Sequence, residues 1–277
     1  MHIIKNILVP IDFSKCAANA MNFALEIAVR TDAHIHVLHV VYQNEHIGDG
    51  EFSGLWFDEY VESRGKDLVK WIGRFRKNSA FKDIKITTTC TTGFPISMIK
   101  ALAGDKKADL IVMGTTGATG IRELFIGSNA AGVMSSVKIP VLAIPEKTDF
   151  LKHANYVFAT DYGISMDKHS WNVLKEILKI QHSSVHILHV LTKPEEQPNQ
   201  SAENQIRQHL EDVNCEFKYL HGNSVQDTVN AYIEATNATG LVTVSHQHSF
   251  IYKLIFQSNS KNLVQRSRTP ILVLHDR

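Results

Sequence analysis

The sequence of 277 residues has little of what marks several large classes of protein. Its three cysteines, Cys16, Cys90 and Cys215, are odd in number and form no Cys-x-x-Cys pair, so no disulfide framework is indicated. No apolar run approaches the roughly 18 residues that span a bilayer. The N-terminal residues also lack a signal-peptide pattern. We therefore expect buried thiols and a cytoplasmic protein.

An excess of charge of either sign is also missing. The 29 basic residues nearly balance the 28 acidic ones, and the net charge of +1 offers no electrostatic case for a nucleic acid or a membrane surface as partner. The chain is 44% hydrophobic and 21% charged, close to the average of globular proteins, so neither disorder nor a fibrous class is indicated.

Several well-known functional motifs are absent as well. No Gly-Lys-Ser/Thr follows a glycine-rich segment, which excludes a Walker A loop, and there is no G-x-G-x-x-G dinucleotide fingerprint. Neither the G-x-S-x-G elbow of serine hydrolases nor the H-E-x-x-H motif of zinc proteases occurs. We assign no catalytic residue.

What the chain does have is a repeat of one unit. Three pairs of segments recur in the same order: 6–12 and 155–161, 36–41 (HVLHVV) and 186–191 (HILHVL), and 138–144 and 268–274. Copies that each span about half of the chain predict a duplicated domain rather than a solenoid of short repeats. We expect domains at 1–147 and 148–277, with a linker near 146–155.

In each copy, short apolar runs alternate with helical patterns. The strands expected are 6–12, 34–41, 84–91, 109–113 and 140–144, then 156–161, 184–191, 215–221, 240–244 and 271–274. The helices expected are 14–30, with Ser14 as N-cap, 57–78, 95–106 and 128–137, then 167–181, 202–213, 224–236 and 259–266. This alternation predicts an α/β protein of two tandem, Rossmann-like, doubly wound domains, each a five-stranded parallel sheet flanked by helices.

A glycine-rich segment follows the fourth expected strand. Gly114, Gly117 and Gly127 precede Ser128 and Asn129, where a helix is expected to begin. Glycines allow backbone N–H groups to approach a phosphate, and a helix N-terminus adds partial positive charge. The glycines could instead form only a tight turn, with Ser128 as an ordinary N-cap.

Asp12 ends the first expected strand. Parallel sheets bind ligands at the carboxyl ends of their strands, where the strand order reverses. If the first and fourth strands are neighbours there, Asp12 and Gly114 face one crevice. Capping of the first helix is the alternative role for Asp12, and the two roles are compatible.

These motifs together resemble the universal stress protein family. The resemblance rests on residues 7–14 (ILVPIDFS), 38–40 (LHV), 108–114 (ADLIVMG), the Gly114/Gly117/Gly127-Ser128 spacing and 138–142 (KIPVL). It implies a regulatory or stress-response role and a dimer-like arrangement, here a pseudo-dimer of the two copies within one chain, with a homodimer as a further option. One branch of the family binds ATP through this motif.

By that resemblance, the ATP-binding residues are Pro10, Ile11, Asp12, Val40, Met113, Gly114, Gly117, Gly127, Ser128 and Asn129. Asp12 would bond the ribose or the adenine edge, and the backbone of Val40 would contact adenine. Gly114 and Gly117 would line the ribose-phosphate path, and Gly127 to Asn129 would hold the phosphates. ATP with or without Mg²⁺ is the expected ligand, with AMP and ADP as alternatives, since the adenine contacts are largely backbone.

The second copy departs from this pattern. Ser245, His248 and Gln257 stand where we align Gly114, Gly117 and Gly127, whereas Asp161 and Ser258-Asn259 are retained. Side chains at the former glycines would block a phosphate, so we expect one nucleotide site per chain. A slow ATPase or other nucleotide-dependent enzyme and a pure interaction module remain the alternatives.

Two further residue types invite a functional interpretation. The 15 histidines include the His34/His36 and His246/His248 pairs, but a pair supplies only two ligands, so no metal site is predicted. His39 and His189 recur at equivalent places, which favours a packing or supporting role. Arg122 would lie either on a phosphate or on a solvated helix face.

Overall fold

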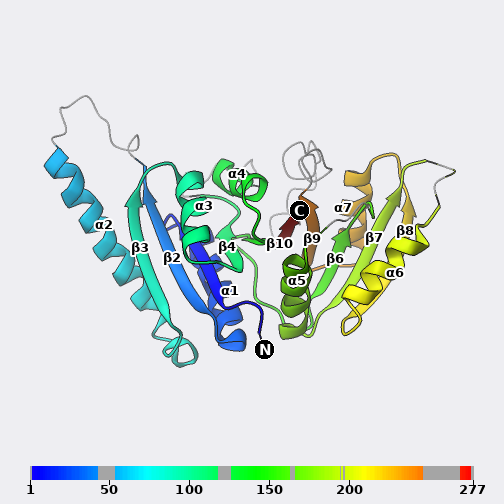
Figure 1. Cartoon of the computed structure of the whole chain (residues 1–277), viewed down its shortest axis with the longest axis horizontal. Coiled ribbons are helices and arrows are strands. Elements are labelled where there is room, and N and C mark those ends of the chain that lie inside the picture. Colours follow the sequence, from blue (N-terminus) through cyan, green and yellow to red (C-terminus); the bar gives the residue numbers. More distant parts are fainter. Residues whose placement is uncertain are drawn as a thin grey trace.

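The computed structural model describes residues 2–42, 54–117, 126–162, 166–193, 195, 197–245 and 269–275. Within these ranges, one ten-stranded sheet runs through the molecule in the order β3-β2-β1-β4-β5-β10-β9-β6-β7-β8. The strands are parallel within each repeat. The expected α/β class, with two tandem five-stranded parallel units, is therefore confirmed (Figure 1).

Strands and helices alternate along both repeats. The first contains β1 (Asn6–Ile11), α1 (Lys15–Thr31), β2 (His34–Val41), α2 (Gly54–Phe75), the 3-10 helix η2 (Ser79–Phe81), β3 (Ile86–Thr92), α3 (Pro95–Asp105), β4 (Leu110–Gly114), α4 (Ser128–Ser136) and β5 (Val141–Ile144). The second contains β6 (Asn155–Ala159), α5 (Lys168–Ile180), β7 (Ser184–Leu191), α6 (Gln200–His209), β8 (Asn214–His221), α7 (Val225–Ala235), β9 (Gly240–Ser245) and β10 (Ile271–His275).

Local hydrogen bonds explain where several elements begin and end. Ser14 is the N-cap of α1, as predicted, and its hydroxyl accepts the N–H of Ala17 at 3.0 Å. The first strand ends at Ile11 rather than at residue 12, because Phe13 adopts a left-handed conformation with φ 64°. The helix expected at 202–213 spans Gln200–His209 instead, with its N-cap side chain accepting an N–H one turn later. The helix expected at 259–266 lies outside the described residues.

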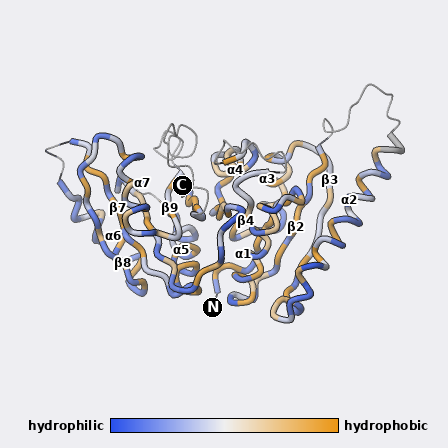
Figure 2. Tube along the Cα trace, turned by 180° about the vertical axis from the view of Figure 1, so that it is seen from behind, coloured by the Kyte–Doolittle hydropathy of each residue, from blue (hydrophilic) through white to orange (hydrophobic). Residues whose placement is uncertain are grey.

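The two faces of the sheet carry separate hydrophobic cores. Leu25 of α1, Leu68 of α2 and Ile206 of α6 belong to the first core, and Ile99 of α3 and Val133 of α4 belong to the second. In Figure 1, α3, α4 and α7 accordingly lie in the upper part of the molecule, whereas α1 and α5 lie in its lower part. Along α2, hydrophobic and hydrophilic positions alternate, as expected for a helix that covers the sheet with one face (Figure 2).

The two repeats meet at one antiparallel pair of strands in the middle of the sheet. Val141, Leu142 and Ala143 of β5 face β10, and Ile271 pairs with Ala143. The remaining neighbours in each repeat are parallel, so the strand direction reverses only at this joint of the described sheet. Two repeats joined in this way form a pseudo-dimer within one chain.

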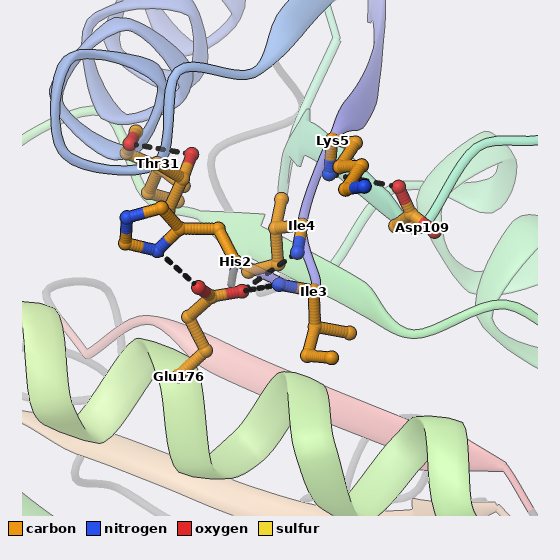
Figure 3. A network of polar contacts seen from close by, with 8 residues as sticks. His2, Ile3, Ile4, Lys5, Thr31, Asp109 and Glu176 are labelled. Carbon is orange, nitrogen blue, oxygen red and sulfur yellow. Dashed lines mark hydrogen bonds and ion pairs between the residues drawn. The ribbon is translucent and has the colours of Figure 1, made fainter.

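A second connection between the repeats is made by the N-terminal segment. Glu176 of α5 accepts the N–H of Ile3 at 2.9 Å and that of Ile4 at 2.6 Å with one carboxylate oxygen, and its other oxygen lies 2.6 Å from Nδ1 of His2 (Figure 3). The Glu176 side chain is 10% exposed, and Ile4 is fully buried. One carboxylate of the second repeat therefore satisfies backbone donors of the first.

Glu176→Ala is expected to lower the free energy of unfolding by about 2 kcal/mol, because it leaves backbone donors without an acceptor. Urea unfolding followed by circular dichroism measures the loss. Glu62→Ala is the matched control, since Glu62 is 69% exposed in its ion pair with Lys66 and should shift the midpoint little. Equal midpoints for the two variants would show that the hydrogen bonds between Glu176 and the N-terminal segment contribute nothing to stability.

Candidate functional site

The sheet order places the two halves of the predicted motif side by side. β1 pairs with β4, and the strand order reverses between them, so Asp12 and Gly114 flank the switch point as expected. Oδ1 of Asp12 accepts the N–H of Ser14 at 3.0 Å. Its Oδ2 lies only 2.9 Å from the position that a Cβ on Gly117 would occupy. A side chain at position 117 would therefore displace the Asp12 carboxylate from its present position.

The two ends of the glycine segment also contact each other. The N–H of Gly127 donates to the carbonyl of Thr115 at 2.7 Å, and a Cβ on Gly127 would lie 3.7 Å from the nitrogen of Gly117. Gly127 is the N-cap of α4 and supplies no capping side chain, and the exposed Ser128 and Asn129 follow it. N–H groups of a first turn have no partner within their helix, so this end of α4 can bind an anion.

Gly114 has a packing role that the sequence did not predict. A Cβ at this position would lie 3.0 Å from Sγ of Cys16, 3.1 Å from its carbonyl carbon and 3.2 Å from the nitrogen of Ala17. All three atoms belong to the first turn of α1. The missing side chain thus allows α1 to pack closely against the end of β4.

The apolar residues of the predicted site lie on one face of the sheet. Met113 is 5% exposed in the second core, and Val40 packs against the same core. Pro10 follows Leu8 of that core by two residues and so shares its face. Ile11 is the exception, because its side chain lies in the first core and its carbonyl is 3.0 Å from Nδ1 of His39.

The backbone of Val40 lies at the carboxyl end of β2, next to the end of β1. The described β1–β2 ladder ends with the pair Ile11–His39, one residue before Val40. On its other side, Val40 is paired with Thr91 of β3. On the side toward β1, the backbone of Val40 therefore lies past the last described pair of the β1–β2 ladder.

His39 and His189 have equivalent supporting roles, as expected. Nδ1 of His189 lies 2.9 Å from the carbonyl of Thr160, which matches the contact between His39 and the end of β1. Each ring also packs against a left-handed aromatic residue, Phe13 in the first repeat and Tyr162 in the second. Sequence reasoning missed these two aromatic residues, although both directly follow the aspartates that it singled out.

The sheet register corrects one alignment between the repeats. Gly114 pairs with Ile144, and the equivalent pair in the second repeat is Val244 with Leu274, so Val244 and not Ser245 stands in the place of Gly114. The Val244 side chain is 5% exposed in the first core. The predicted positions Arg122, His246, His248, Gln257, Ser258 and Asn259 lie outside the described residues.

The His34/His36 pair is a packing contact in which His36 is buried and His34 is partly buried. Its ring centroids are 4.0 Å apart, and Nδ1 of His36 lies 2.9 Å from the hydroxyl of Thr87. Burial, His34 and the ammonium groups of Lys106 and Lys85 lower the pKa of His36 to about 4. The described part of the chain holds no group of three or more metal-ligating side chains.

Comparisons with known proteins agree with this architecture. A model of the universal stress protein family matches residues 4–145 and again residues 158–275. The chain belongs to the universal stress protein family.

Relatives with similar sequences match about half of the chain. A universal stress protein of Methanocaldococcus jannaschii is 33% identical over 144 residues, which cover 52% of this chain and 83% of the relative. A putative universal stress protein of Staphylococcus saprophyticus is 30% identical over 145 residues, covering 50% and 83%. The crystal structure of a universal stress protein from Archaeoglobus fulgidus covers 98% of both chains with a TM-score of 0.70 at 19% identity, which shows a shared fold across both repeats.

Proposed function

We propose that this universal stress protein is a regulatory or stress-response protein that binds ATP in its first repeat, with AMP or ADP as alternative ligands. The observation that carries the proposal is the N-terminus of α4, where Gly127 supplies no capping side chain and donates its N–H to the carbonyl of Thr115 at 2.7 Å, on the segment that leads to Gly117 beside Asp12. We place the domain boundary at residues 147 and 148 and the protein in the cytoplasm. Among the described helices, none is long and apolar enough to cross a membrane.

The proposed contacts follow the order of the ligand groups. The first-turn N–H groups of α4 and the Ser128 hydroxyl bind the phosphates, because the helix end offers unpaired donors and partial positive charge. Asp12 accepts a hydrogen bond from the ribose or the adenine edge. The backbone of Val40 contacts adenine above the apolar surface of Pro10. Magnesium, where present, binds on the phosphate side.

One site per chain is expected, because the second repeat has lost features of the first. Asp161 is retained but exposed, and Val244 replaces the first glycine. α1 begins at Lys15, soon after Asp12, whereas α5 begins only at Lys168, well after Asp161. Val244, in the place of Gly114, is buried in the first core.

Isothermal titration with Mg-ATP tests the proposal and should give a stoichiometry of about one per chain. Titrations with ADP, AMP and inorganic tripolyphosphate show which groups are recognised. Mass spectrometry of small molecules released from freshly purified, denatured protein identifies any ligand that copurifies. Absence of binding at millimolar Mg-ATP, with no nucleotide released, would overturn the proposed function.

A further inference from the structure

Two aromatic rings lie beside the end of the proposed crevice where the base would bind. Tyr42 directly follows β2, and Phe94 is the N-cap residue of α3. Their ring centroids are 5.5 Å apart, with 53° between the ring planes. The Phe94 side chain is 67% exposed, so the contact with Tyr42 leaves most of its surface in solvent.

The backbone holds Phe94 next to the proposed adenine contact. The N–H of Gly93 donates to the carbonyl of Val41 at 3.2 Å, and Thr91 pairs with Val40. Gly93 has φ +136°, a conformation that side chains rarely adopt, and a Cβ there would lie 3.2 Å from Cγ of Met98. The turn between β3 and α3 is thus fixed against the last residues of β2.

The second repeat shows that the contact between this turn and the end of the second strand does not require aromatic rings. There, the N–H of Gly222 donates to the carbonyl of Leu191 at 3.1 Å, which reproduces the contact of Gly93. The residues that follow Leu191 and Gly222 are Thr192 and Asn223, in the places of Tyr42 and Phe94. The rings therefore accompany the repeat that keeps the glycine segment, and the backbone contact forms without them although Gly222, unlike Gly93, does not have a positive φ.

The distances across the sheet suit a nucleotide. Only β1 separates β2 from β4, so the ends of β2 and β4 are about 10 Å apart at the usual strand spacing. This is on the order of the length from a nucleotide base across its ribose to the phosphates. α3 and α4 pack closely, since a Cβ on Gly132 of α4 would lie 2.3 Å from Cδ1 of Ile96 of α3. Both helices follow strands of the same parallel unit, so their N-termini are at the carboxyl edge of the sheet.

We propose that Phe94, supported by Tyr42, stacks on the base of the bound nucleotide and makes the site selective for nucleotides over bare polyphosphates. This inference rests on the proposed function and adds a specificity-determining residue to it. Every base has a π face, so stacking recognises any planar ring system. The backbone of Val40 contacts the edge of the base. Stacking on an aromatic side chain strengthens nucleotide binding by about tenfold or more.

Titration of Phe94→Ala with Mg-ATP and with inorganic tripolyphosphate tests the inference. We expect the affinity for Mg-ATP to fall about tenfold and the affinity for tripolyphosphate to stay within about twofold of the wild type. Phe94→Tyr, which keeps a ring, should bind both ligands as the wild type does. Val69→Ala on α2 is the control, because Val69 is also well exposed, at 61%, and lies outside the crevice.

The possible outcomes separate the two proposals. Wild-type binding of Mg-ATP with no change in Phe94→Ala overturns the stacking role and leaves the proposed function intact. An equal loss for ATP and tripolyphosphate in Phe94→Ala also overturns it, because a base contact cannot affect a ligand without a base. If the wild-type protein binds no nucleotide, both proposals fall together.

Discussion

Gly127→Asp is expected to abolish Mg-ATP binding and to leave the protein at least as stable as the wild type. A Cβ at this position has ordinary contacts, the nearest being the Thr115 carbonyl oxygen at 3.5 Å, so the substitution fits without strain. Asp is a better N-cap than Gly by a few tenths of a kcal/mol, and Gly127 is the N-cap of α4. The new carboxylate would bond the same N–H groups that the phosphates need.

The size of the effect follows from like charges at one site. Placing a carboxylate against a phosphate costs several kcal/mol, which corresponds to a loss of affinity of at least about 100-fold. Isothermal titration measures the affinity, and thermal unfolding checks that stability is kept.

Gly127→Asn is the matched control for charge, since it adds a side chain of the same shape and an equally good cap. We expect it to weaken Mg-ATP binding less than Gly127→Asp does. Equal losses in the two variants would mean that bulk rather than charge is responsible. Unchanged binding in both would remove the phosphates from this end of α4.

Much of the fold could be predicted from local patterns. The β2 bounds agree with the apolar run at 34–41, and α1 begins after the Ser14 cap, because helix caps and hydrophobic periodicity are local properties. The antiparallel pairing of β5 with β10 was not predicted, although a pseudo-dimer was. Pairing between strands far apart in the sequence depends on which sheet edges meet in the folded molecule, and a local pattern does not encode this.

The candidate site shows the same division between local and nonlocal information. The closeness of Asp12 to the glycine segment was predicted, because strand-end residues of a doubly wound sheet meet at its switch point. The packing of Gly114 against Cys16, the inward direction of Ile11 and the aromatic pair of Tyr42 and Phe94 were not. Each of these depends on which face a residue presents or on a contact between elements, and neither is visible in the spacing of a motif.

A comparison of the two repeats clarifies what the first glycine does. Val244 is accommodated in the second repeat, where α5 begins late, and Gly114 is found in the first repeat, where α1 begins early. The glycine is thus linked to the position of the helix. Loss of binding in a Gly114 variant would therefore not separate damage to the packing of α1 from loss of a ligand contact, so it is a poor test of nucleotide recognition.

Gly114→Val is accordingly expected to lower the free energy of unfolding by about 3 kcal/mol, because the added side chain would meet the backbone of Cys16 and Ala17. Valine is a better strand residue than glycine, so β propensity alone would favour the substitution. A loss of stability therefore comes from the steric contact and not from strand propensity. Gly104→Val in α3 is the control, since a Cβ there meets nothing within 4 Å, and its stability should stay within about 0.5 kcal/mol of the wild type.

The double variant Gly114→Val with Cys16→Ala tells which atoms of α1 are responsible. Removing Sγ relieves the 3.0 Å contact but leaves the carbonyl carbon of Cys16 at 3.1 Å and the nitrogen of Ala17 at 3.2 Å. We therefore expect stability to recover only in part, as measured by urea unfolding of the four members of the cycle. Full recovery would show that the thiol alone sets the requirement for glycine, and a stable Gly114→Val single variant would show that α1 can move away from β4 at little cost.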